Sequence, residues 1–201
     1  MIKVLKNPIT QTYIDFKELI SRDNFLWGHA KENYAEGSHP AYFTHPFVLR
    51  PYANEIAPIP KIMCEYTNHA WNVVREILEY NDIHPNLIFR MNLNMTYAQD
   101  LKNQYSPVHT DHVFPHENLL IYFTGHKQGE GGQVIVGDGE GNDEEYYPEE
   151  DDAIIFPGNP HYMKIPKKGF RTALVTTFLS GYNYIPKMRG KEGQTGYEWE
   201  F

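Results

Sequence analysis

The sequence has a single cysteine, Cys64, among 201 residues, so no disulfide can form within the chain. It also has no apolar run long enough to cross a membrane, and no charged start followed by an apolar segment and a cleavage site. These absences predict a soluble protein in the reducing environment of the cytoplasm, without a membrane partner. Cys64 falls in an expected helix, where a small buried hydrophobic role is favoured over a catalytic one.

An excess of basic residues is lacking too. Lys and Arg number 18 against 26 Asp and Glu, which gives a formal net charge of −8. A protein that binds the nucleic-acid backbone needs a concentrated basic face, so a nucleic-acid partner is disfavoured. A protein, peptide or small-molecule substrate stays open. The hydrophobic content of 41% and aromatic content of 14% are typical of a folded domain rather than a disordered chain.

The apolar periodicity changes along the chain. Helical spacing predicts helices over 10–26 and 60–80, separated by a loop-like segment with a short strand at 42–49. From Leu87 the pattern alternates, and it places Arg90, Asn92 and Asn94 on one polar face of a strand. That face either lines the mouth of a barrel or faces water.

Short strands separated by glycine and proline turns follow, which indicates an all-β barrel or sandwich. Further strands are expected around the following segments: 1–5, 105–112, 118–124, 133–136, 146–147, 153–156, 162–165 and 170–179. We predict one domain over 1–201, with a helical and loop support at 1–86, a β core at 87–180 and a tail at 181–201.

The stretch His109-Thr110-Asp111 carries the main chemical signal. Residues two apart in an extended segment share a face, so His109 and Asp111 are expected to project together. With the distant His161 they make up two histidines and one carboxylate, the set that holds Fe(II) and leaves positions open for substrate and dioxygen. The alternative is a polar pair at the end of a strand.

Arg171 lies ten residues beyond His161, inside an apolar run. Burying a guanidinium is costly unless a carboxylate or similar group meets it. The sequence alone therefore indicates either a carboxylate-binding site or an ordinary buried ion pair.

The order and spacing of these motifs resemble the iron(II)- and 2-oxoglutarate-dependent dioxygenases, specifically the prolyl-4-hydroxylase-like branch, with a hint of its phage-type members. The resemblance covers about 87–179 and rests on these segments: 109–111, 119–123, 131–134, 152–156, His161 and 169–174. It implies a mainly β (α+β) fold, a double-stranded β-helix or jelly roll with N-terminal helices packed on its outer face.

The resemblance also implies the residues of the site. His109, Asp111 and His161 are expected to be the catalytic Fe(II) ligands. Arg171 is expected to grip the distal carboxylate of 2-oxoglutarate, with the hydroxyl of Tyr122 donating to the same group.

Two more tyrosines and three more histidines lie close to these motifs in the sequence. Tyr97 is a further cosubstrate-binding candidate, although its spacing to the motif is longer than in relatives, and Tyr105 competes with it. His112 is read as a residue behind the ligands or at the surface. His116 and His126 are placed in a turn and a loop.

The activity implied is hydroxylation of an unactivated C–H bond with O2, releasing succinate and CO2, with ascorbate as a supporting reductant. A prolyl residue in a protein or peptide leads as substrate, ahead of a free amino acid, another small metabolite or nucleic acid. A cupin-like metal-binding module and a zinc hydrolase with Glu117 as base are other classes. The acidic loop at 137–152 either flanks the site and attracts a basic or proline-containing peptide, or is simply solvated. The oligomeric state is not predicted.

Overall fold

The computed structural model describes residues 2–30, 40–49, 61–137 and 141–180, and the backbone of 187–189 and 198–200. The helices are α1 (Gln11–Ile20) and α2 (Thr67–Tyr80). The strands are β1 (Lys3–Leu5), β2 (Gly28–Ala30), β3 (Tyr42–Leu49), β4 (Lys61–Ile62), β5 (Pro85–Tyr97), β6 (Glu117–Tyr122), β7 (Val134–Gly137), β8 (Asp143–Tyr146), β9 (Ala153–Pro157), β10 (His161–Met163), β11 (Phe170–Ser180), β12 (Lys187–Arg189) and β13 (Glu198–Glu200).

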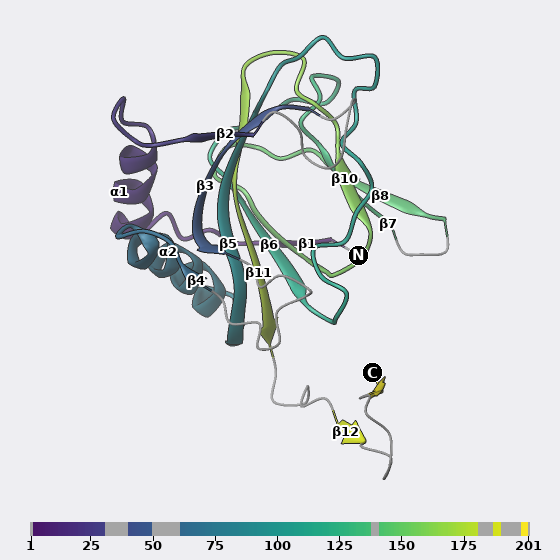
Figure 1. Cartoon of the computed structure of the whole chain (residues 1–201). Helices are drawn as coiled ribbons and strands as arrows, with labels where there is room; N and C mark the ends of the chain where they lie inside the picture. The colour runs from purple at the N-terminus through teal and green to yellow at the C-terminus, as the bar shows by residue number, and fades with distance from the viewer. Residues whose placement is uncertain are drawn as a thin grey trace.

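Two antiparallel sheets face each other (Figure 1). The main sheet has the strand order β1-β9-β6-β11-β5-β3-β2, with β4 paired to β3. The smaller sheet has the order β10-β7-β8, and β12 pairs with β13 in a separate two-stranded sheet. This arrangement confirms the predicted jelly roll. Four strands of the main sheet, β1 to β4, come from the supporting segment at 1–86. Strands β1 and β3 match the short strands expected at 1–5 and 42–49, whereas β2 and β4 were not predicted.

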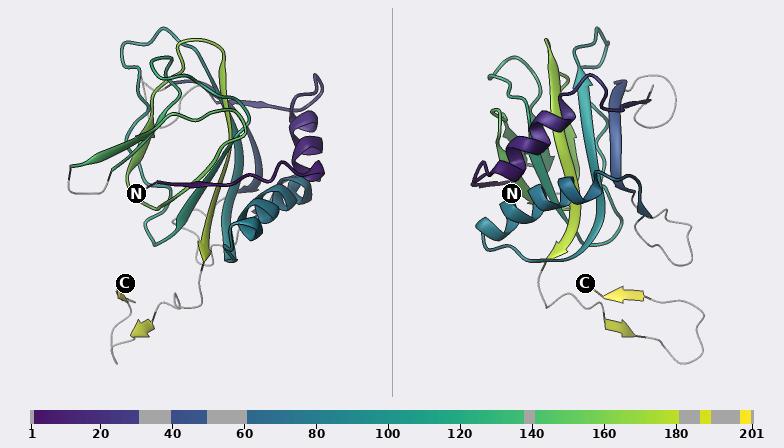
Figure 2. Two further views of the ribbon diagram at one scale, coloured as in Figure 1. Left: turned by 180° about the vertical axis from the view of Figure 1, so that it is seen from behind. Right: turned by 90° about the vertical axis from the view of Figure 1, so that its left-hand side faces the viewer.

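The outer face of the main sheet is covered by both helices (Figure 2). Alternate residues of a strand point to opposite faces, and Met91 and Leu93 of β5 turn outward into a core that includes Phe16 of α1 and Val74 of α2. These side chains are almost fully buried. Each such burial stabilises the fold by about 1.5–3 kcal/mol.

The inner face of the main sheet has its own apolar core. Leu120 and Tyr122 of β6 pack with Phe156 of β9, Ala173 of β11 and Val134 of the smaller sheet. Because residues next to these on β6 belong to the outer core, the strand is apolar throughout, as is typical of a strand buried on both faces. The space between the two sheets is where the polar residues of the candidate site lie.

Both predicted helices are shorter than expected. The second begins at Thr67 instead of 60, because Lys61 and Ile62 pair with β3 as an additional strand. The first ends at Ile20 instead of 26, where the hydroxyl of Ser21 donates to a carbonyl of the last turn. Position 60 itself lies outside the described residues.

The motif segment around His109 is not a regular strand, contrary to the prediction. Only two isolated bridges form in it, Tyr105 with Lys164 and His109 with His161. Pro107, between them, has no amide hydrogen to donate to a ladder. The segment is nevertheless extended enough that Val108 is exposed while Asp111 is buried, so the predicted common face of His109 and Asp111 holds.

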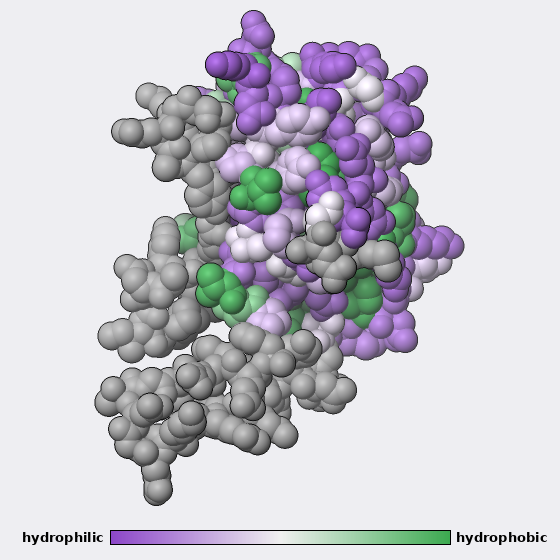
Figure 3. Space-filling model, turned by 90° about the vertical axis from the view of Figure 1, so that its right-hand side faces the viewer, coloured by the Kyte–Doolittle hydropathy of each residue, from purple (hydrophilic) through white to green (hydrophobic). Residues whose placement is uncertain are grey.

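The outer surface on the side of the smaller sheet is mainly hydrophilic (Figure 3). Strand β8, with the sequence DEEY, exposes its three acidic residues. The apolar side chains of Val134 and Val136 in β7 are buried instead, in the core between the two sheets. In the described part of the chain, neither helix has the length and apolar character needed to span a membrane.

Candidate active site

The two histidines of the site are joined through their backbones. The amide of His109 donates to the carbonyl of His161 over 3.0 Å, and the amide of His161 donates back over 2.9 Å. The two rings lie 4.5 Å apart between centroids. Ligand atoms of His109, Asp111 and His161 all lie within 4.8 Å of one another.

Each histidine presents the same nitrogen to the centre. Nδ1 of His109 lies 3.0 Å from the carbonyl of Pro107, and Nδ1 of His161 lies 2.9 Å from the carbonyl of Asn159. A carbonyl can only accept, so both Nδ1 atoms carry the proton and both Nε2 atoms keep a lone pair. Such second contacts orient histidine ligands in metal sites. The donor set therefore fits a metal with nitrogen and oxygen ligands and open positions.

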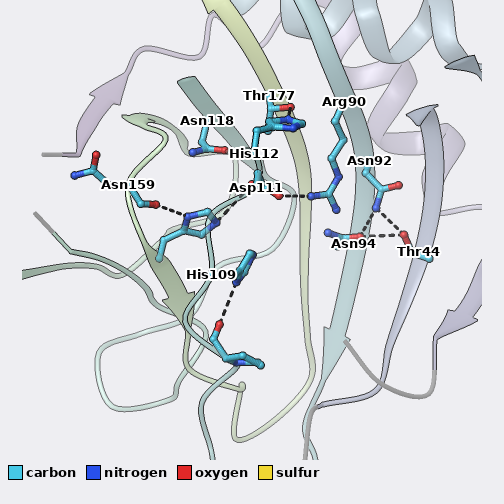
Figure 4. Close-up of polar contacts among 12 residues, drawn as sticks. Thr44, Arg90, Asn92, Asn94, His109, Asp111, His112, Asn118, Asn159 and Thr177 are labelled. Carbon is cyan, nitrogen blue, oxygen red and sulfur yellow. Dashed lines mark hydrogen bonds and ion pairs between the residues drawn. The ribbon is translucent and has the colours of Figure 1, made fainter. Parts of the chain in front are cut away.

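Asp111 is fixed from the opposite side by an arginine (Figure 4). Nη1 of Arg90 donates to Oδ1 over 2.5 Å, while Oδ2 lies 3.6 Å from Nε2 of His161. Burial raises the pKa of Asp111, but the charge of Arg90 and the nearby histidines lowers it to about 2. Burial lowers the pKa of His161 to about 4. At neutral pH both groups are in the protonation states that bind a metal.

A cavity of about 380 Å³ opens beside these three side chains. Its lining combines the candidate ligands with polar and apolar residues of both sheets: Pro40, Tyr42, Arg90, Asn94, Thr96, Ser106, His109, Asp111, Leu120, Val134, His161, Tyr162, Met163, Arg171 and Val175. Among these described lining residues, Asp111 is the sole carboxylate. The polar face of β5 thus lines the interior of the barrel and does not face water.

Arg171 reaches into the cavity from β11 and is only 4% exposed. Its Nε donates to the carbonyl of Gly132 over 2.9 Å, and Nη2 donates to the hydroxyl of Tyr122 over 3.2 Å. The guanidinium also lies 5.0 Å from the centroid of the Tyr122 ring. Within the described ranges no carboxylate pairs with it, so the ordinary buried ion pair is not what the structure shows.

The carbonyl that accepts the hydrogen bond from Nε of Arg171 belongs to Gly132, which follows another glycine, Gly131. Their φ angles are +80° and +82°, in the region where glycine is favoured. A Cβ at Gly131 would lie 2.2 Å from the carbonyl oxygen of Ile165, and one at Gly132 would lie 2.5 Å from the ring of His126. The chain therefore needs glycine at both positions to bring this backbone against the arginine.

The comparison with known proteins rests on structure. No protein-family model and no curated protein sequence matches the chain. An oxidoreductase of the 2OG-Fe(II) oxygenase family from Burkholderia pseudomallei aligns with a TM-score of 0.67 at 13% identity, over 90% of this chain and 87% of that one. A second similar structure is a prolyl hydroxylase from Trichoplax adhaerens in complex with a peptide fragment of the hypoxia inducible factor oxygen degradation domain. It aligns with a TM-score of 0.58 at 14% sequence identity, over 89% of this chain and 83% of that one. The alpha ketoglutarate dependent epimerase SnoN from nogalamycin biosynthesis aligns with a TM-score of 0.55 at 9% sequence identity, over 89% of this chain and 77% of that one.

This chain has the fold of the 2OG-Fe(II) oxygenases. The resemblance drawn from the sequence motifs is confirmed at the level of the fold.

Not every predicted site residue of this oxygenase fold reaches the cavity. Tyr122 contacts Arg171 as described, and burial raises the pKa of its hydroxyl, which stays protonated. Tyr97 does not line the cavity: its neighbour Thr96 does, and Tyr97 turns to the other face, against Phe43. Tyr105 is 37% exposed and packs edge-on against Tyr162.

The other histidines lie outside the group of ligand atoms. Nε2 of His112 lies 2.8 Å from the hydroxyl of Thr177, behind Asp111 (Figure 4). His116 is buried, with Nδ1 bonded to the carbonyl of Phe114. His126 bonds to the carbonyl of Phe170.

Glu117, the candidate base of a zinc hydrolase, does not line the cavity and instead accepts hydrogen bonds from the amide and hydroxyl of Ser180. No carboxylate other than Asp111 in the described lining is in a position to serve as that base.

Several acids of the segment at 137–152 have structural partners. Asp151 accepts from Tyr13 and pairs with Lys17, while Asp152 accepts from Tyr146. Positions 138–140 lie outside the described residues.

The sequence left open whether Arg90 and Asn94 line the mouth of the barrel or face water, and the structure places both in the cavity lining. The sequence pattern that points to them is a polar residue at every second position of an otherwise apolar strand. The hydrogen bond from Arg90 to Asp111 could not be predicted from the sequence, because it joins β5 to an irregular segment.

Proposed function

We propose that this chain is an Fe(II)- and 2-oxoglutarate-dependent dioxygenase that hydroxylates an unactivated C–H bond. One observation carries the proposal. A single cavity combines a set of two histidines and one carboxylate with a buried arginine that has no acidic partner among the described residues. A cupin-like binding module or a zinc hydrolase needs no such arginine.

His109, Asp111 and His161 would hold Fe(II), whose preferred ligands include this set. With 2-oxoglutarate and O2, bound iron supplies the transfer of one oxygen atom to carbon, while 2-oxoglutarate is oxidised to succinate and CO2. Arg171 would grip the distal carboxylate of 2-oxoglutarate through charge-assisted hydrogen bonds, and the hydroxyl proton of Tyr122 is available to the same carboxylate.

For the substrate, we propose a prolyl carbon in a protein or peptide. The motifs resemble the prolyl-4-hydroxylase-like branch, and a structural neighbour is a prolyl hydroxylase with a bound peptide. A free amino acid or another small metabolite is the second candidate. The polar wall formed by Arg90 and Asn94 favours it, and the epimerase neighbour shows that the fold also serves small-molecule chemistry.

The test is succinate release by the purified chain with Fe(II), 2-oxoglutarate and O2, with and without proline-containing peptides and small metabolites. We expect release to require both Fe(II) and 2-oxoglutarate, and mass spectrometry to find one added oxygen atom on a stimulating substrate. Chelation of the metal should stop release, and ascorbate should prolong it. Succinate release that persists in the His161→Ala variant would contradict the proposal.

A further inference from the structure

We propose that Arg90 and Asn94 form a second carboxylate-binding site, which holds an anionic group of the substrate beside the iron. The substrate class is therefore a small molecule that carries a carboxylate near the carbon to be hydroxylated, such as a free amino acid. This inference rests on the proposed function. It favours the second substrate candidate given there, a free amino acid or another small metabolite, over the prolyl residue.

The side chain of Asn94 is held with its amino group toward the cavity (Figure 4). Its Oδ1 accepts from the hydroxyl of Thr44 over 3.0 Å and from Nδ2 of Asn92 over 2.5 Å. Asn92 also donates to Thr44 over 2.6 Å. Because the network occupies the oxygen of Asn94, the Nδ2 protons are left to face the cavity that Asn94 lines.

Arg90 adds charge to the same wall. It lies two residues from Asn92 and four from Asn94 on β5, so all three share one face of the strand. Its Nη1 donates to Oδ1 of Asp111. A guanidinium has five N–H donors in a fixed fork, so others remain for a second carboxylate at this 19% exposed side chain.

The two arginines lie at different levels of the β5–β11 pair, with Arg171 near the start of β11 and Arg90 near the middle of β5. Arg171 stands opposite Thr96, and Thr177 stands opposite Arg90. These positions are six residues apart on each strand, which corresponds to about 20 Å of backbone. A 2-oxoglutarate molecule held by Arg171 and the iron therefore leaves Arg90 to another ligand. Asn94 stands opposite Ala173, between the levels of the two arginines, and its amide faces the same space.

The charges at the site support an anionic ligand. Fe(II), Asp111, the two arginines and dianionic 2-oxoglutarate together leave one positive charge uncompensated among the described lining residues. One further carboxylate neutralises it. This local balance is opposite in sign to the formal net charge of −8 for the whole chain.

The cavity size agrees with a small partner. Its volume of about 380 Å³ must hold both the cosubstrate and the reacting part of the substrate, and it lies near the lower end of small-molecule sites.

The experiment uses acetate as a general carboxylate probe, with acetamide as its neutral match. Mn(II) replaces iron in the full-length chain under nitrogen, 2-oxoglutarate is saturating, and proton relaxation of the probe reports binding near the metal. We expect saturable relaxation enhancement for acetate and none for acetamide. Equal behaviour of the two probes would overturn the proposal.

Asn94→Asp is the decisive variant, because its carboxylate can still accept from Thr44 and Asn92 but faces the cavity with negative charge. We expect acetate affinity to fall about tenfold to a hundredfold, as for loss of a charge-assisted hydrogen bond. Arg90→Lys keeps a positive charge beside Asp111 and should weaken acetate by a similar factor. Asn86→Asp, the same change at an exposed position of β5 outside the cavity lining, should leave it unchanged.

Two outcomes separate the sources of failure. If saturating 2-oxoglutarate displaces acetate from the wild-type chain, Arg90 and Asn94 bind the cosubstrate. The inference is then wrong, while the proposed function stands. If Mn(II) does not bind, as measured by calorimetry, the proposed function fails together with the inference. Unchanged acetate affinity in Asn94→Asp that still binds Mn(II) and 2-oxoglutarate also overturns the inference.

Discussion

His109 and His161 exchange two backbone hydrogen bonds, at 3.0 and 2.9 Å, across a single antiparallel bridge. The bridge brings together two candidate ligands that are distant in the sequence. Since these bonds are made by main-chain atoms, the positions of the ligands do not depend on the imidazole rings themselves. Function and folding should therefore respond separately to substitution at these positions.

His161→Ala should abolish Fe(II)-dependent succinate release while leaving the metal-free fold intact. Alanine keeps the amide and carbonyl of the bridge, and the ring lost is replaced by a smaller apolar group. We expect calorimetry to show no Mn(II) binding, and circular dichroism to show an unchanged β signal. A variant that binds Mn(II) like the wild type would mean that the ligand set is wrong.

Arg171→Met should weaken 2-oxoglutarate binding more than it changes turnover at saturation. A buried hydrogen bond to a charged group contributes about 1.5–3 kcal/mol, which corresponds to a rise in KM for 2-oxoglutarate of roughly ten- to a hundredfold. Steady-state kinetics at several 2-oxoglutarate concentrations measure this. Lys168→Met, at an exposed position nearby in the sequence, is the control. A fall in kcat with KM unchanged would argue against a cosubstrate role.

Gly132→Ala should destabilise the fold and loosen Arg171, whereas Gly129→Ala should have a smaller effect. Both glycines have φ near +80 to +90°, so both variants carry backbone strain. Only the Cβ at Gly132 meets a neighbour, the ring of His126 at 2.5 Å, while that at Gly129 meets nothing within 4 Å. Thermal unfolding of the two variants isolates the cost of the clash. Equal losses would show that His126 moves aside freely.

The metal-free protein should lose stability through His126 as the pH falls below about 6.5. Burial lowers the pKa of His126 from its ordinary value of 6.5, although the carbonyl of Phe170 opposes the shift. Below that value the unfolded chain takes up a proton more readily than the folded chain, so the free energy of unfolding decreases. Above it both states are neutral, and the contribution is constant. The slope from this one group stays below about 1.4 kcal/mol per pH unit.

Urea unfolding at pH 7.5 and 5.5 measures this slope. His126→Gln should reduce it, and His84→Gln, whose side chain is 72% exposed, should not. The same slope in wild type and His126→Gln would rule out the assignment.

Much of the architecture is readable from local sequence pattern. The alternation after Leu87 predicts β5, and the common face of His109 and Asp111 survives in the structure even though the segment is not a strand. These features depend on residues close together in the chain, where side-chain direction follows directly from backbone geometry.

Features that depend on distant pairing could not be predicted. The start of α2 shifts because Lys61 and Ile62 pair with β3, a contact that helical spacing cannot reveal. Tyr97 has the chemistry expected of a cosubstrate contact, but the register of β5 turns Thr96 inward in its place. The Arg90–Asp111 contact depends on the path of an irregular loop.

The main sheet carries an apolar layer on each side, with the helices on one and the cavity on the other. Substitutions on the helix side of the sheet change the packing that supports β5. Substitutions at the inward positions of β5 change which ligand the cavity binds. Because successive residues of one strand serve these two purposes, a lineage that descends from this chain can change its chemical preferences one residue at a time without rebuilding its scaffold.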